Sequence, residues 1–189
     1  MKFFTFFLCL LILAATGRAQ KNPAVEMYIV NFAPLAMEEQ IRTGMPAAIK
    51  LAQAIHESGA GNGDLAQRSN NHFGLKCKAN WTGNTAYHDD DAKGECFRAY
   101  DSVSQSYRDQ SDYLKNNKRY ASVFALDVTD YKGWANGLKQ AGYATNPAYT
   151  RMLIQLIETY ELFVFSEKAK ENTNVTIPKA IMPATVSSH

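Results

Sequence analysis

The stretch LAQAIHESGAGNGDLAQRSNNHFGLK, residues 51–76, joins the end of a predicted helix to a loop rich in glycine and asparagine. Pro46 suits the first turn of that helix and Gly59 suits its end. Small apolar residues on one side of the helix favour close packing against other helices. The stretch therefore predicts a central helix over residues 46–59, with Glu57 in its last turn.

A carboxylate in the last turn of a helix faces the negative end of the helix dipole, and partial burial would disfavour its charge further. Both effects raise the pKa, so Glu57 is expected to keep its proton near neutral pH. Such a group can protonate a leaving oxygen. An exposed acidic residue that merely ends a helix is the alternative. The glycine-rich loop after Glu57 favours the catalytic interpretation, because its backbone could lie close to a bulky polar ligand.

Apolar residues recur at helical spacing in four further stretches, residues 24–44, 102–117, 131–142 and 147–165. Pro34 is expected to break or kink the first of these helices. The region between residues 70 and 100 contains short runs of strand-forming residues instead, and DAKGE at residues 91–95 suits a hairpin turn. The pattern predicts one α+β domain, mainly helical, with a helical lobe and a small β lobe.

Both ends of the chain differ from this domain. Residues 1–19 have a positive start, an apolar run and small residues before a cleavage point after Ala19, as a secretory signal peptide has. A transmembrane anchor is one alternative, although the run is shorter than the roughly 20 residues that a span needs, and a lipid on Cys9 is another. Residues 166–189 are polar and lack periodicity, so we expect a flexible tail after a domain of residues 20–165.

Two cysteines, Cys77 and Cys96, remain after the predicted cleavage. An even number of cysteines in an exported chain favours a disulfide, and two buried thiols are the alternative. Zinc bound by these cysteines together with nearby histidines and aspartates is a further alternative. The spacing opposes zinc, because the sequence lacks the tight pairs of ligands that zinc sites use. The ligand types considered are His72, Cys77, His88, Asp89, Asp91 and Cys96.

Five blocks of sequence carry a pattern beyond periodicity. They are residues 51–76, the Trp-x-Gly of residues 81–83, FRAYDS at 97–102, RYASVF at 119–124 and AGYATNPAYTRMLIQLI at 141–157. In this order they resemble the glucosaminidase domain of bacterial autolysins and of the flagellar-rod muramidase type, glycoside hydrolase family 73. The resemblance covers residues 28–162. It implies a lysozyme-like fold and hydrolysis of the β-1,4 bond after N-acetylglucosamine in peptidoglycan.

The resemblance also implies roles for particular residues. Glu57 matches the catalytic acid of the family, and Tyr143 matches a tyrosine that lines the cleft near the reacting sugar. Asn71, Phe73 and Tyr149 match further positions near the groove and are expected to contact the substrate. From the residues alone, Phe73 and Tyr149 are equally compatible with core aromatics, and Asn71 with a turn former.

A second carboxylate is the usual requirement of a glycosidase. The family commonly places a glutamate in the β lobe, whereas this chain has HDDDAKGE at residues 88–95. The candidates are Asp89, Asp90, Asp91 and Glu95. Alternation along a strand places Asp89 and Asp91 on one face and Asp90 on the other. We favour Asp90 for its place in the hairpin, and a solvated acidic turn is the alternative.

The expected partner is a peptidoglycan glycan strand lying in a groove between the two lobes. Lys2 and Arg18 are the only charged residues of the predicted signal, so its removal lowers the formal net charge from +2 to zero. This balance gives no reason to expect nucleic acid or a membrane as partner. We expect a monomer without cofactor or metal, located in the periplasm or outside the cell. A lytic transglycosylase and a non-catalytic wall-binding module are the competing interpretations.

Overall fold

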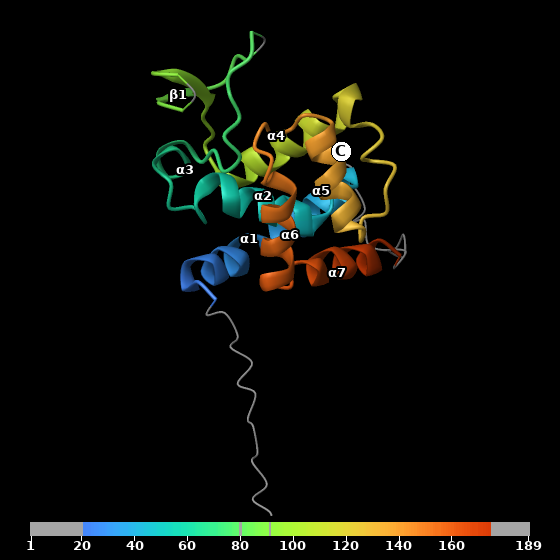
Figure 1. The fold of residues 1–189 in the computed structure, drawn as a ribbon. Helices are drawn as coiled ribbons and strands as arrows, with labels where there is room; N and C mark the ends of the chain where they lie inside the picture. The colour runs from blue at the N-terminus through green and yellow to red at the C-terminus, as the bar shows by residue number, and fades with distance from the viewer. Residues whose placement is uncertain (1–20, 80, 91, 175–189) are drawn as a thin grey trace, which may run out of the picture.

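The computed structural model describes residues 21–79, 81–90 and 92–174 (Figure 1). The mainly helical α+β class expected from the sequence is confirmed. The elements in these residues are α1 (Pro23–Thr43), α2 (Ala47–Ser58), α3 (Asp64–Ser69), β1 (Thr85–His88), β2 (Glu95–Arg98), α4 (Val103–Lys115), the short 3-10 helix η1 (Lys118–Tyr120), α5 (Tyr131–Gln140), α6 (Tyr149–Thr159) and α7 (Phe163–Asn174).

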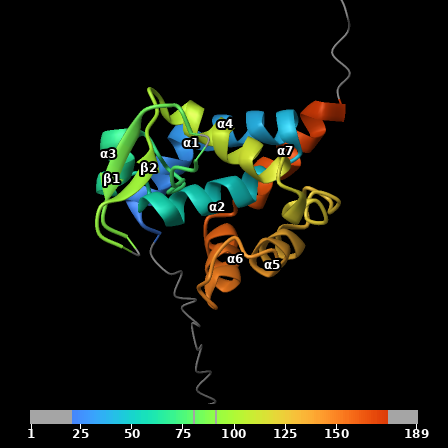
Figure 2. The ribbon, with the colours of Figure 1, turned by 90° about the horizontal axis from the view of Figure 1, so that it is seen from above.

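Helix α2 forms the centre of the molecule. Its residues from Ala47 to Ile55 are all buried, and α1, α5, α6 and α7 pack against it. Figure 2 shows the sheet and α3 at one end of α2, and the other helices along the length of α2. The small side chains of the helix allow this close approach on several sides. Glu57 lies in its last turn, as predicted.

Helix α1 runs through Pro34 without ending there, so the expected break is absent. Proline removes one backbone hydrogen bond from a helix. Ala33 and Ala36, on either side of Pro34, are buried in the core, and this packing supports the continuous helix. The helix ends at Gly44, whose φ of 86° is in the left-handed region that glycine adopts readily.

The C-terminal region differs from the sequence-based expectation in two ways. The single helix expected over residues 147–165 is divided into α6 and α7, with Glu161 at a φ of 55° between them. Residues 166–174 belong to α7, which packs on α1 and α2, so the expected start of a flexible tail at residue 166 is corrected. The polar sequence conceals the contact because small residues, Ser166 and Ala169, face the core. Residues 175–189 lie outside the described residues.

The β lobe is a hairpin joined to the preceding loop. Strands β1 and β2 pair antiparallel with His88 opposite Glu95, so the predicted turn is confirmed. Leu75 O accepts a hydrogen bond of 2.9 Å from Arg98 N. Cys77 and Cys96 form a disulfide with Cα atoms 5.4 Å apart, as predicted. Because both thiols are used in this bond, neither is free to bind zinc.

The length and polarity of the helices in the described ranges bear on whether any of them could span a membrane. None of them combines the length and the apolar character that crossing a membrane requires. The predicted signal peptide, residues 1–19, lies outside the described residues. The figures place the β lobe and the α5–α6 region on different sides of the C-terminal end of α2, where Glu57 lies.

Candidate active site

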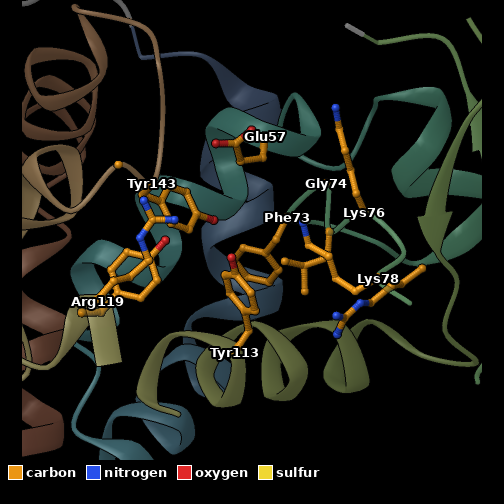
Figure 3. Close-up of a pocket in the computed structure, with 12 residues that line it drawn as sticks. Glu57, Phe73, Gly74, Lys76, Lys78, Tyr113, Arg119 and Tyr143 are labelled. Carbon is orange, nitrogen blue, oxygen red and sulfur yellow. The ribbon is translucent and has the colours of Figure 1, made fainter. Parts of the chain in front are cut away.

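Glu57 lines a pocket of about 270 Å³ to which both lobes contribute (Figure 3). On the side of the helical lobe, the wall of the pocket consists of residues from α4, η1 and the loop after α5. The segment that leads into the β lobe provides the opposite wall. The lining residues are Glu57, Phe73, Gly74, Leu75, Lys76, Lys78, Arg98, Tyr113, Arg119, Tyr120, Gly142 and Tyr143.

A compact turn follows Glu57. Gly59, Ala60 and Gly61 have φ values of 57°, 55° and 79°, and this left-handed run reverses the chain directly after α2. Ser58 holds the turn, since its Oγ accepts a hydrogen bond of 2.8 Å from Gly61 N and its carbonyl accepts one of 2.8 Å from Gly63 N. These glycines do not line the pocket, so the expected approach of their backbone to a ligand stays a prediction. They serve the turn that ends α2 beside the cleft.

The carboxyl group of Glu57 is protonated more readily than an ordinary glutamate. Its pKa is raised from 4.5 to about 7, first because the surrounding protein removes water from the charged form and second because of the negative charge of Asp90. The side chain remains open to the pocket. The predicted acid therefore has both a proton near neutral pH and access to a ligand.

Tyr143 lies in the same pocket and is held from behind by a buried polar network. Lys50 Nζ donates to Gln110 Oε1, which fixes the amide of Gln110 with its nitrogen toward Tyr143. Gln110 Nε2 then donates to Tyr143 Oη at 3.4 Å and to Gln53 Oε1 at 3.0 Å, and Gln53 Nε2 donates to Tyr149 Oη at 2.8 Å. Because Tyr143 Oη accepts from Gln110, its own hydrogen is available to the pocket.

Tyr149 occupies the layer behind the pocket. Its side chain is 1% exposed, and its ring centroid lies 5.7 Å from that of Tyr143. It is absent from the lining of the pocket. Burial and the negative charge of Glu57 raise the pKa of Tyr143, which therefore stays a neutral phenol. The structure thus gives Tyr149 a supporting contact with Tyr143 in place of the expected contact with substrate.

Asn71 and Phe73 are both buried, but only Phe73 lines the pocket. Asn71 Nδ2 donates to the carbonyls of Leu75 at 3.0 Å and Arg98 at 2.8 Å, and its Oδ1 accepts from Leu75 N at 3.1 Å. These bonds use both amide hydrogens, so Asn71 shapes the loop and ties it to β2. Phe73 packs edge-on against Tyr107 with ring centroids 4.9 Å apart. It forms an apolar part of the pocket wall.

Two of the four candidate second carboxylates, Asp90 and Glu95, contact the same lysine. Lys76 Nζ lies 3.1 Å from Asp90 Oδ2 and 2.9 Å from Glu95 Oε1. Neither acid lines the pocket, whereas Lys76 does. The charge of Asp90 raises the pKa of Glu57, so Asp90 is the candidate that is electrostatically connected to the acid.

Asp89 has a different partner. Asp89 Oδ1 accepts a hydrogen bond of 2.6 Å from Gly94 N, which occupies it in closing the hairpin turn. Asp91 lies outside the described residues. The role of Asp90 stays a prediction; it is the candidate whose charge acts on Glu57, and Glu95 is its neighbour on Lys76.

Several pocket residues were not recognised in the sequence. Tyr107 and Tyr113 share a helical spacing that predicts core positions for both. Tyr107 is fully buried, but Tyr113 lies at the edge of α4 and lines the pocket. Arg119 stands in one of the five sequence blocks, yet no charge pattern marks it as a pocket residue. Only the fold brings it to Gly142 and Tyr143, more than twenty residues later in the chain.

Comparison with known proteins places this site in a family. Residues 33–162 match the family described as mannosyl-glycoprotein endo-beta-N-acetylglucosaminidase. The peptidoglycan hydrolase FlgJ of Pseudomonas aeruginosa is 33% identical over 163 residues, covering 78% of this chain and 40% of that protein. The exo-glucosaminidase LytG of Bacillus subtilis is 32% identical over 152 residues, covering 74% of this chain and 52% of that protein. The chain thus spans about half or less of the length of these relatives.

Solved structures agree in fold. A peptidoglycan hydrolase from Sphingomonas sp. A1 has a TM-score of 0.65 and 28% identity, covering 82% of this chain and 99% of that one. The glycoside hydrolase domain of FlgJ from Salmonella typhimurium has a TM-score of 0.61 and 27% identity, covering 80% of this chain and 97% of that one. The expected lysozyme-like architecture is confirmed by these likenesses. Because the family match extends over more than half of the sequence, the chain belongs to the glucosaminidase family, glycoside hydrolase family 73.

Proposed function

We propose that this protein is an exported peptidoglycan hydrolase that cleaves the β-1,4 bond after N-acetylglucosamine, with Glu57 as the general acid. The observation that carries the proposal is the carboxyl group of Glu57, with a pKa of about 7, in a pocket between two lobes. The names of the relatives FlgJ and LytG, a peptidoglycan hydrolase and an exo-glucosaminidase, support the substrate and the bond.

The chemistry begins with the proton of Glu57. Transfer of this proton to the glycosidic oxygen allows the bond between that oxygen and the anomeric carbon to break, with positive charge developing on the sugar. The released hydroxyl end keeps the proton. The Tyr143 hydroxyl, whose hydrogen is available to the pocket, lies beside this reaction and can donate a hydrogen bond to the sugar. Water then adds to the anomeric carbon.

The water step needs a group that accepts a proton or replaces the water. We propose Asp90 as the β-lobe carboxylate that removes a proton from the attacking water. Its charge is felt at Glu57, and its ion pair with Lys76 places it beside the pocket wall. Alternatively, the acetamido group of the substrate attacks first, and Asp90 then stabilises the charge of that intermediate. The two routes differ in whether a neighbouring acetamido group is required.

The cellular setting belongs to the same proposal. Residues 1–19 direct export and are removed, which leaves a monomeric enzyme in the periplasm or outside the cell. Its partner is a glycan strand of the wall, held in the groove between the lobes. The balanced formal charge of the chain after this removal supports the absence of a nucleic-acid or membrane partner.

The test is a digestion of purified peptidoglycan followed by mass spectrometry of the products. Reducing N-acetylglucosamine ends are expected. Anhydro-muramyl ends would instead assign the chain to lytic transglycosylases, and binding to the insoluble wall without any release would make it a glycan-binding module. The two kinds of product differ in mass, and a binding module gives no product, so one experiment separates the three functions.

Glu57→Gln is expected to lower the rate of release by about a hundredfold or more, because a glutamine cannot supply the proton. Glu38→Gln is the matched control, since Glu38 is an exposed helical acid of α1 outside this pocket. The thermal midpoint of both variants checks that the fold is kept. Activity retained by Glu57→Gln would remove this residue from the role of acid.

A further inference from the structure

The cleft carries positive charge that the protein itself does not neutralise. Four cationic residues line the pocket around Glu57, namely Lys76, Lys78, Arg98 and Arg119. Two are paired within the protein: Arg98 Nη1 lies 2.7 Å from Asp109 Oδ2, and Lys76 contacts Asp90 and Glu95. For Arg119 and Lys78, the part of the chain that the structure describes offers no ion pair.

Arg119 is positioned beside Tyr143 by its surroundings. Its guanidinium lies 5.5 Å from the ring centroid of Tyr120, and its Nη2 is 2.6 Å from the point that a Cβ on Gly142 would occupy. A side chain at residue 142 would therefore displace the guanidinium. Figure 3 shows Arg119 reaching toward Tyr143 along the wall of the pocket. The missing side chain of Gly142 leaves room for the cation next to the reacting sugar.

Lys78 provides a second cation on the other side of the pocket. It is exposed and follows Cys77, whose disulfide fixes this segment to β2. In Figure 3, Lys78 lies on the β-lobe side and Arg119 on the opposite side, with the pocket between them. The two unpaired cations thus face the cleft from different lobes.

We propose that Arg119, assisted by Lys78, forms a carboxylate-binding subsite that selects glycans bearing acidic substituents. This inference rests on the proposed function and names the feature of the substrate that the cleft recognises. A guanidinium binds a carboxylate through two parallel hydrogen bonds, which gives both affinity and orientation. The peptide stems of peptidoglycan, and its lactyl ethers where no stem is attached, carry carboxylates, whereas a plain polymer of N-acetylglucosamine is neutral. The cations are also expected to attract the anionic strand before it binds.

The test compares two substrates that contain the same glycosidic bonds. Peptidoglycan is used as purified, and a second portion has its carboxylates converted to amides. For the acidic substrate, Arg119→Ala is expected to raise KM about tenfold or more, because the charge-assisted hydrogen bonds to the carboxylate are lost, while kcat changes little. For the amidated substrate, the parent protein and Arg119→Ala should have the same KM. Arg119→Lys should recover part of the affinity, because a point charge remains.

Lys118→Ala is the matched control, since it removes the neighbouring positive charge outside this pocket. An equal rise in KM for both substrates, or no rise for either, would overturn the subsite. Cosedimentation of the protein with acidic and amidated walls measures the same preference without catalysis. If the parent protein released no reducing ends, the proposed function would fail, and cosedimentation would still decide whether Arg119 recognises carboxylates.

Discussion

The proton of Glu57 is controlled by groups that are distant in the sequence. The carboxyl group lies at the end of α2, and the loop after α5 and the segment near Phe73 complete its surroundings. These neighbours partly remove water from the carboxyl group and so raise its pKa, and Asp90 adds negative charge from the hairpin. The raised pKa of Glu57 is therefore a property of the assembled pocket, and with the proposed role of general acid its titration should appear in the rate of hydrolysis.

The pH dependence of hydrolysis follows from this pKa. The general acid must be protonated, and its pKa is raised from 4.5 to about 7. The rate is therefore expected to be retained up to neutral pH and to fall as pH rises through about 7, by roughly tenfold per pH unit above it. Initial rates of reducing-end release between pH 5 and 9 measure this limb. A limb centred near pH 4.5 would contradict the raised pKa.

Asp90 and Glu95 provide a matched comparison for the second carboxylate, because both contact Lys76. Asp90→Asn is expected to lower kcat by about a hundredfold or more, the usual contribution of a general base. Removing its charge should also lower the pKa of Glu57 and move the alkaline limb to lower pH. Glu95→Gln should have the smaller effect on both quantities. The reverse order of kcat values would transfer the role to Glu95.

The sequence predicted some site residues better than others, for physical reasons. Glu57 was predictable because a helix end and a glycine turn are local signals. The orientation of the Asn71 and Tyr149 side chains was not predictable, because a match to a family position near a groove does not say whether the side chain faces the ligand. Asn71 has its hydrogen bonds used by the loop, and Tyr149 supports Tyr143. The position of the Arg119 guanidinium depends on the absence of a side chain at Gly142, which lies far along the sequence.

At the scale of elements, local patterns gave the types correctly and some boundaries incorrectly. The helices and the hairpin follow from periodicity and turn residues. The division between α6 and α7 does not, because apolar residues continue across it and the left-handed Glu161 carries no glycine signal. The six residues of α3 were also missed within the loop. Short elements depend on tertiary contacts more than on propensity.

The hairpin depends on its covalent link to the loop that carries Lys76 and Lys78. The disulfide closes a loop between two residues that are 19 positions apart in the sequence. Replacing both Cys77 and Cys96 by serine opens this loop. The chain-entropy estimate for such a loop is about 3 kcal/mol of unfolding free energy. Denaturant titration of the parent and the double variant measures this loss. An unchanged midpoint in the double variant would contradict this estimate.

At the scale of the whole molecule, α2 is held at its N-terminal end by two other helices. Its C-terminal end presents Glu57 to the cleft. At its N-terminal end, Pro46 provides no side-chain cap, and the first free backbone groups are satisfied from elsewhere. Ala47 N donates to Gln40 Oε1 at 2.8 Å, and Ala48 N donates to Ser166 Oγ at 2.9 Å. The helix that carries the acid is thus capped by α1 and α7.

The Ser166 hydroxyl accordingly links the region expected to be a tail to α2, the helix that carries Glu57. Ser166→Ala leaves the buried N–H of Ala48 without its partner, which costs about 1–2 kcal/mol of unfolding free energy. Glu167→Ala is the control, since Glu167 is the exposed neighbour on the same helix. Denaturant midpoints measure both variants. Ser166 contacts the N-terminal end of α2, whereas Glu57 lies in the last turn at the other end. The destabilised variant should therefore keep the alkaline limb near pH 7 while it remains folded. Equal losses for the two variants would mean that α7 contributes packing alone.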